Sequence, residues 1–131
     1  MTDSRARSSS SLQGKRILVV EDEALVSMML EDLLTDLGCE IVGPAARLKK
    51  ANELASGAPC DGALLDLNVN GEVTYGVARI LNDRGIPFAF VTGYDPSWIS
   101  EPYRARPMIP KPIRPERLKE VLNAMLDQPL H

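Results

Sequence analysis

The chain has 131 residues, of which 44% are hydrophobic and 25% are charged, as in an ordinary globular domain. Its 15 basic and 18 acidic residues give a formal net charge of −3, so composition does not favour binding to nucleic acid or to an acidic membrane surface. No apolar run approaches the length of about 20 residues that a membrane span needs, and no apolar secretory signal begins the chain. We therefore expect one cytoplasmic domain.

Cysteine and histidine are too sparse for metal or imidazole chemistry. Cys39 and Cys60 fit no metal-binding spacing, and each precedes an apolar run, so we expect small buried or half-buried thiols and no disulfide. The single histidine is the last residue, His131. Any catalytic chemistry must therefore use carboxylates, hydroxyls or lysine.

The chain opens with a polar tail and then a buried strand. Residues 1–14 are too polar to pack and are expected to be disordered. Residues 17–20 are continuously apolar, as in a strand covered on both faces, and the acids Glu21, Asp22 and Glu23 follow. For Glu23 we expect only a solvated loop or a favourable charge near a helix N-terminus.

A helix, a strand and a second helix come next. Apolar residues recur at helical spacing over residues 24–37, and we expect Met28 and Met29 to fill the core there. Residues 39–42 predict a short strand that the following Gly-Pro pair closes. Residues 47–56 place their apolar side chains on one helical face and predict the second helix.

The third strand ends in a carboxylate. The run Ala63-Leu64-Leu65 predicts a buried strand, and Asp66 follows it directly. A lone Asp after a strand often only caps a turn. At the C-terminal end of a parallel strand, however, open α/β sheets form the crevice that holds ligands. Asp66 is therefore the leading candidate for a reactive group.

The second half of the chain continues the alternation. We expect a loop over residues 68–72, a helix over 76–82 and a buried strand over 86–91 that is followed by Thr92. The stretch 95–106 is a poor helix candidate because proline interrupts it, so we expect a short or mobile segment there.

A last strand and helix complete the pattern. Residues 108–109 predict a brief strand, and Lys111 follows it between two prolines that restrict the backbone. Pro115 suits the first turn of a final helix whose apolar residues recur up to Met125.

Five alternations of strand and helix predict an α/β fold, a doubly wound five-stranded parallel sheet with right-handed crossovers, in a single domain. All strand C-termini then meet at one edge of the sheet, which brings together Glu21, Asp22, Asp66, Thr92 and Lys111.

This set of side chains favours phosphoryl transfer. Clustered carboxylates repel one another, and a hard cation with oxygen ligands, Mg²⁺, relieves the repulsion best. Asp66 would be the nucleophile toward a phosphoryl group. The Thr92 hydroxyl and the Lys111 ammonium would complete the cradle for its oxygens.

The motifs that carry these residues occur in a characteristic order: Glu21-Asp22, Leu64-Leu65-Asp66, Val91-Thr92-Gly93 and Lys111-Pro112. Over residues 15–128 the chain resembles the receiver domain of two-component response regulators, here a stand-alone one. The resemblance implies the flavodoxin-like strand order 2-1-3-4-5.

The resemblance also implies a role for each site residue. Asp66 would accept phosphate from a sensor histidine kinase, with a histidine phosphotransfer protein as a second candidate partner. Glu21, Asp22 and Asp66, with the backbone carbonyl of Asn68, would hold Mg²⁺. Such a protein is a monomer or weak dimer, catalyses only its own phosphorylation and dephosphorylation, and signals through a phosphorylation-dependent surface.

One motif points to a subfamily. Residues 90–94, Phe-Val-Thr-Gly-Tyr, resemble the Phe-Ala-Thr-Gly signature of the FATGUY receivers, and Met108 stands where most receivers carry an aromatic switch residue. We therefore expect phosphate to order the segment after Thr92 instead of flipping a ring. Tyr94, Trp98 and Tyr103 would form the partner surface, unless these rings pack on the core.

Two other classes of function use the same residues. A Mg²⁺-dependent aspartyl-phosphate phosphatase of the haloacid-dehalogenase type would need a second Asp two residues after Asp66, where this chain has Asn68. A phosphorylation-independent interaction module would not need Asp66, Thr92 and Lys111. Phosphate transfer from a small-molecule donor distinguishes the three classes.

Overall fold

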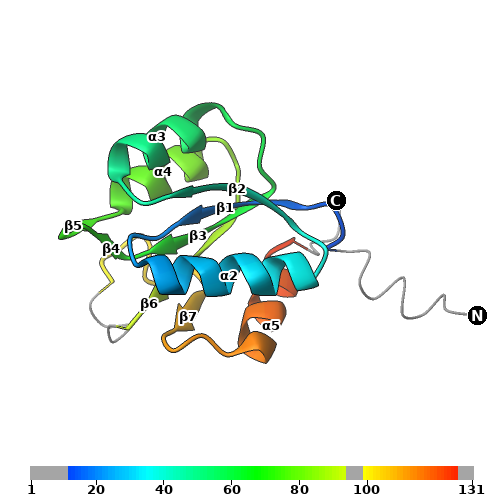
Figure 1. Cartoon of the computed structure of the whole chain (residues 1–131). Helices are drawn as coiled ribbons and strands as arrows, with labels where there is room; N and C mark the ends of the chain where they lie inside the picture. Colours follow the sequence, from blue (N-terminus) through cyan, green and yellow to red (C-terminus); the bar gives the residue numbers. More distant parts are fainter. Residues whose placement is uncertain (1–11, 94–98, 127–131) are drawn as a thin grey trace, which may run out of the picture.

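A parallel sheet of five strands forms the centre of the protein, in the order β2-β1-β3-β6-β7 (Figure 1). The structure is a computed structural model that describes residues 12–93 and 99–126. The strands of this sheet are β1 (Arg16–Val20), β2 (Glu40–Ala45), β3 (Gly62–Asp66), β6 (Phe88–Thr92) and β7 (Met108–Pro110). When these five strands alone are numbered along the chain, their spatial order across the sheet is 2-1-3-4-5, which confirms the predicted flavodoxin-like fold.

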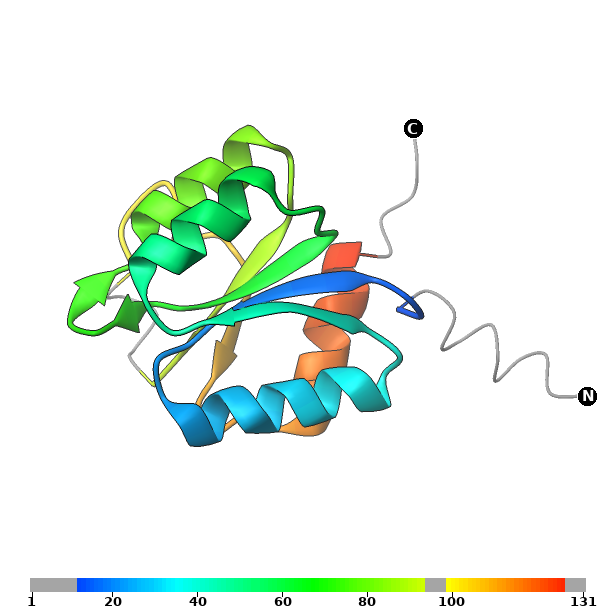
Figure 2. The same cartoon turned by 45° about the horizontal axis from the view of Figure 1, so that its top comes forward.

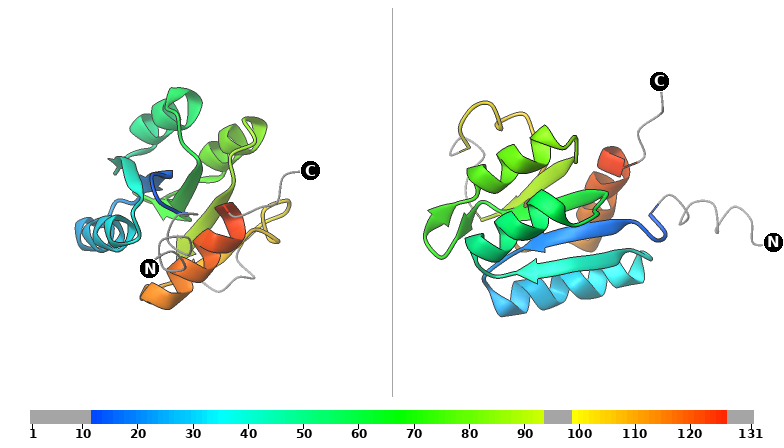
Figure 3. Two further views of the ribbon diagram at one scale, coloured as in Figure 1. Left: turned by 90° about the vertical axis from the view of Figure 1, so that its right-hand side faces the viewer. Right: turned by 90° about the horizontal axis from the view of Figure 1, so that it is seen from above.

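Helices cover both faces of the sheet. They are α2 (Ala24–Asp36), α3 (Leu48–Gly57), α4 (Tyr75–Asp83) and α5 (Pro115–Leu126). Helices α3 and α4 lie on one face, and α2 and α5 lie on the other, as the end-on view of Figure 3 shows. Because the central strands are covered on both sides, every residue of β3 and of β6 is buried, as their continuous apolar runs predicted.

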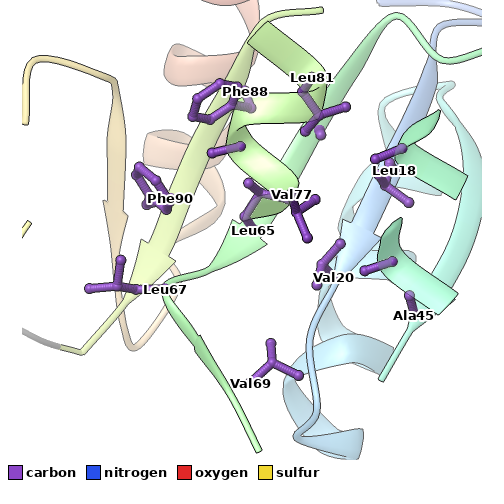
Figure 4. Close-up of a cluster of buried hydrophobic side chains, with 14 of the residues drawn as sticks. Leu18, Val20, Ala45, Leu65, Leu67, Val69, Val77, Leu81, Phe88 and Phe90 are labelled. Carbon is purple, nitrogen blue, oxygen red and sulfur yellow. The ribbon is translucent and has the colours of Figure 1, made fainter. Parts of the chain in front are cut away.

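Alternate residues of the strands pack into two separate hydrophobic cores, one on each face of the sheet. On one face, Leu18 and Val20 of β1, Leu65 of β3 and Phe88 and Phe90 of β6 pack against α3 and α4 (Figure 4). On the other face, the neighbouring strand residues pack against α2 and α5. The two cores hold the strand ends at fixed positions relative to one another.

Strand β2 is longer than the sequence predicted. It continues through Gly43 and Pro44 to Ala45, and the pairing shifts register between Leu18 and Val20 of β1. Proline is tolerated because β2 is an edge strand, where its missing N–H removes no ladder hydrogen bond. Gly43 has φ +93, a backbone conformation that favours glycine.

The segment predicted as a loop after Asp66 contains a short hairpin instead. Strands β4 (Asn68–Val69) and β5 (Glu72–Val73) pair antiparallel. Asn70 and Gly71 connect them with φ of 52 and 82, the positive values that a type I′ turn requires at both central positions. The Asn-Gly dipeptide was the sequence signal for this hairpin.

The prediction that Met28 and Met29 fill the core is wrong. Their exposed fractions are 59% and 43%, and that of Leu25 is 81%. Helix α2 has more apolar residues than one face can bury, and its buried stripe follows Ser27, Leu30 and Leu34. An apolar patch of Leu25, Met28 and Met29, called here the α2 patch, therefore faces solvent.

The domain begins before residue 15. Leu12 is buried, and the Gly14 N–H donates to the Gly38 carbonyl at 2.7 Å, so residues 12–14 pack with the fold and do not belong to the predicted tail. The rest of that tail lies outside the described residues.

Cys39 and Cys60 are free thiols, one buried and one half-buried, as predicted. Among the described residues, none of the helices combines the length and the apolar character that crossing a membrane requires.

Residues 99–107 contain no helix and rest on α4. Ile99 is buried, and the Ser100 N–H donates to the Tyr75 hydroxyl at 2.8 Å. Tyr103 stacks on Tyr75 with ring centroids 5.3 Å apart and packs against the core. For Tyr103 the alternative of packing on the core therefore holds, whereas Tyr94 and Trp98 lie outside the described residues.

Candidate functional site

The predicted site residues sit at the C-terminal ends of four neighbouring strands. Glu21 and Asp22 follow β1, Asp66 ends β3, Thr92 ends β6 and Lys111 follows β7. The β4–β5 hairpin lies at the same edge of the sheet (Figure 2). The sheet therefore gathers side chains that are up to 90 residues apart in sequence.

Three acids form a compact group of oxygens. Ligand atoms of Glu21, Asp22 and Asp66 all lie within 4.8 Å of one another. Glu21 and Asp66 are buried, with exposed fractions of 2% and 6%. Backbone N–H groups hold two of the carboxylates, because Glu23 donates to Glu21 Oε2 at 3.1 Å and Asn70 donates to Asp22 Oδ2 at 2.9 Å. The second contact ties the hairpin turn to the acid group.

The environment of Glu21 fits a bound cation. Burial, reinforced by the neighbouring Asp66 carboxylate, raises the pKa of Glu21 from 4.5 to about 7. Its Oε1 atom is buried and accepts no hydrogen bond among the described residues, and Nζ of Lys111 lies 3.3 Å away. A crowded group of carboxylates with an unpaired buried oxygen is a donor set that suits Mg²⁺.

Lys111 is the cation of the site. Its Nζ lies 2.7 Å from Glu23 Oε1, 3.1 Å from Asp66 Oδ2 and 3.3 Å from Glu21 Oε1. Burial alone lowers the pKa of Lys111, but the hydrogen bonds to Glu23 and Asp66 and the surrounding negative charge outweigh burial and raise it. The ammonium is therefore charged at neutral pH.

Asp66 is held by contacts on both its backbone and its side chain. The Thr74 hydroxyl donates to the Asp66 carbonyl at 2.7 Å, and the Asn68 N–H donates to Asp66 Oδ1 at 3.1 Å. The other carboxylate oxygen, Oδ2, faces Lys111. A backbone N–H thus holds one carboxylate oxygen, and the other lies against the ammonium of Lys111. The Asn68 carbonyl as a metal ligand stays a prediction.

Thr92 lies beside Asp66 at the end of the neighbouring strand. Asp66 pairs with Val91, so Thr92 is one residue beyond that pair, and it is buried. The Lys111 N–H donates to the Thr92 carbonyl at 2.9 Å, which ties the lysine backbone to the strand end. The backbone thus brings Thr92, Lys111 and Asp66 to one place, as predicted.

These groups open onto a cleft of about 410 Å³, which is lined by Asp22, Glu23, Asp66, Asn68, Gly93 and Lys111. Sequence reasoning missed Glu23, which makes the shortest contact to Lys111 and is not merely a solvated charge. It also missed Thr74 and Asn70, which support Asp66 and Asp22. The Asn70-Gly71 turn signal could have revealed Asn70, but nothing in the sequence indicated the Glu23 contact.

Comparison with known proteins supports one family. No protein-family model matches the chain. It is 30% identical over 116 residues to the chemotaxis protein CheY of Thermotoga maritima, covering 84% of this chain and 96% of that protein. The solution structure of SdrG from Sphingomonas melonis Fr1 is 37% identical, with a TM-score of 0.78, over 86% of this chain and 97% of that one. A second solution structure, 37% identical with a TM-score of 0.74, is of the BeF3-activated conformation of SdrG.

The chain belongs to the receiver domains of response regulators. Domains of this family act in signalling and are not classical enzymes. The phyllosphere-induced regulator PhyR of Methylorubrum extorquens is 28% identical over 96% of this chain, but this match covers only 49% of PhyR. The chain thus spans about half the length of that relative.

Proposed function

We propose that the protein is a single-domain response regulator that accepts a phosphoryl group on Asp66 from a sensor histidine kinase, in a Mg²⁺-dependent reaction. The observation that carries the proposal is the contact of 3.1 Å between the Lys111 ammonium and Asp66 Oδ2, beside a group of three acids. The Lys111 ammonium can contact the Asp66 carboxylate before the transfer and a phosphoryl oxygen after it.

The proposed reaction uses few groups. A carboxylate oxygen of Asp66 attacks the phosphorus of a phosphohistidine, the P–N bond breaks, and the imidazole leaves and takes up a proton. The Thr92 hydroxyl and the Lys111 ammonium bind phosphoryl oxygens, which is the positioning that phosphoryl transfer needs most. When held by Glu21, Asp22, Asp66 and the Asn68 carbonyl, Mg²⁺ supplies further positive charge to those oxygens.

The likeness to SdrG supports this chemistry. A BeF3-activated conformation has been determined for that relative, and BeF3 on a carboxylate resembles a phosphoryl group in charge and shape. The four strand-end motifs of this chain provide the acid group, the acceptor, the hydroxyl and the cation.

The partner must reach the cleft from outside. A kinase or phosphotransfer protein that delivers phosphohistidine to Asp66 has to cover the surface beside the cleft. Helix α2 starts at Ala24, immediately after the acids, and carries the α2 patch defined above. Exposed methionine and leucine at one place are typical of a protein-binding surface. We propose that the phosphodonor docks on the α2 patch.

Labelling with acetyl phosphate tests the proposal. Asp66 should take up one acid-stable, base-labile acyl phosphate in the presence of Mg²⁺, and EDTA should prevent it. Asp66→Asn removes the anionic nucleophile and should abolish labelling. Asp61→Asn is the matched control, since it removes the same charge at the opposite end of β3, where Asp61 accepts from the Arg16 N–H.

If Asp66→Asn labels as well as the parent, the acceptor is not Asp66 and the proposal is wrong. If the parent labels only when a kinase is supplied, a phosphotransfer profile against the histidine kinases of the host identifies the donor.

A further inference from the structure

The ammonium of Lys111 has its three N–H donors aimed at three carboxylates. It donates to Glu23 Oε1 at 2.7 Å, to Asp66 Oδ2 at 3.1 Å and to Glu21 Oε2 at 3.5 Å. The shortest of them is made by the acid that does not belong to the group of potential metal ligands. Lys111 therefore has no spare donor for an incoming anion until one of the three is released.

Glu23 differs from the other two acids in its exposure. Its side chain is 61% exposed, whereas those of Glu21 and Asp66 are 0% and 7% exposed. Releasing Glu21 from Lys111 would leave a buried carboxylate without its counter-ion, which is costly. Releasing Glu23 costs little, because water can replace the lysine at an exposed carboxylate.

Glu23 also serves no other visible purpose through its side chain. It occupies the N-cap position of α2 in an extended conformation, but its side chain makes no capping hydrogen bond. It lines the cleft and points its carboxylate to Lys111. The backbone of Glu23 supports the site separately, through its N–H to Glu21.

We propose that Glu23 competes with the phosphoryl group for Lys111 and so limits the phosphorylated fraction of the protein. This inference rests on the proposed phosphorylation of Asp66. When Asp66 becomes an acyl phosphate, the lysine donor that faced its carboxylate passes to a phosphoryl oxygen. A second donor reaches the phosphoryl group when Glu23, the exposed acid of the three, gives it up.

Binding of beryllofluoride in saturating Mg²⁺ measures the competition directly. The dissociation constant can be followed through the backbone amide resonance of Gly93, which lines the cleft. Because an exposed ion pair is worth at most about 1 kcal/mol, Glu23→Gln should lower the dissociation constant about two- to fivefold. The fraction phosphorylated by acetyl phosphate at steady state should rise in parallel.

Two further variants separate contact from charge. Glu23→Asp keeps the charge but is one methylene shorter, so it should lose the contact and behave like Glu23→Gln. If Glu23→Asp binds like the parent, simple charge repulsion explains the effect and the proposed competition is wrong. Glu40→Gln removes an equally exposed charge, paired with Arg16 at 3.6 Å, and should leave the dissociation constant unchanged.

The outcomes also distinguish this inference from the proposed function. If the parent binds beryllofluoride but Glu23→Gln binds it no more tightly, only the inference about Glu23 is wrong. If the parent neither binds beryllofluoride nor labels on Asp66, the proposed function fails and the inference fails with it.

Discussion

Replacing Glu21 by Gln should stabilise the metal-free protein at high pH. Burial and the Asp66 carboxylate raise the pKa of Glu21 from 4.5 to about 7, so the folded state binds this proton more tightly than the unfolded chain does. A raised carboxyl pKa means that the free energy of unfolding is highest below pH 4.5 and falls as the pH rises through 7. The free energy of unfolding falls because Glu21 becomes charged while it is buried in the folded site.

The size of the effect follows from the shift. A change from 4.5 to about 7 corresponds to about 3 kcal/mol at 1.36 kcal/mol per pKa unit. Lys111 and Asp66 readjust when Glu21 titrates, so we expect about 2–3 kcal/mol between pH 5 and pH 8. Glutamine has nearly the same shape, and its oxygen can still accept the Glu23 N–H, so Glu21→Gln should remove this loss without creating a cavity.

Urea unfolding in EDTA at several pH values measures the effect. The parent and Glu21→Gln should have similar midpoints at pH 5, and the variant's midpoint should exceed the parent's by about 1–2 M urea at pH 8. Glu40→Gln, which removes an exposed charge far from the site, should follow the parent at every pH. Mg²⁺ should stabilise the parent at pH 8 more than it stabilises Glu21→Gln. Parallel curves for the parent and Glu21→Gln would refute the assigned cause of the shift.

Two further predictions concern the surface and the segment after Thr92. Replacing Leu25 and Met28 by Ser should slow phosphotransfer from the cognate kinase at least about tenfold, since each exposed apolar side chain buried by a partner contributes on the order of 1 kcal/mol or more. Labelling by acetyl phosphate should not change. Equal slowing of both reactions would argue against docking on the α2 patch. Tyr75→Phe removes the acceptor of the Ser100 N–H but keeps the ring, so amide exchange at Ser100 should accelerate about two- to tenfold; an unchanged exchange rate would mean that this hydrogen bond does not hold the segment.

The sequence predicted the sheet because its strands are buried on both faces. A strand such as β3 must be continuously apolar, and a charge such as that of Asp66 is then tolerated only at its end. Parallel strands share one C-terminal edge, so the convergence of Asp66, Thr92 and Lys111 follows from topology alone. Backbone connectivity was therefore enough to assemble the main groups of the site.

Two kinds of feature could not be predicted in this way. One is a contact between long side chains, and the other is the face that a helix turns to the sheet. The contact between Glu23 and Lys111 joins residues 88 positions apart, and it depends on where a flexible lysine ends. The exposure of Met28 depends on which of several apolar stripes of α2 meets the sheet. The buried Ser27 marks a stripe that hydrophobicity alone would not choose.

Glu21 and Glu23 show how burial separates the roles of two identical side chains. Both carboxylates contact Lys111, but Glu21 has no exposed side-chain surface and Glu23 is 61% exposed. The charge of Glu21 cannot be solvated, so it strains the metal-free protein and provides a reason to bind a cation. The charge of Glu23 can be solvated, so its contact with Lys111 is weak enough to break. The proposed metal binding and the proposed release of Lys111 therefore depend on the two glutamates that flank Asp22.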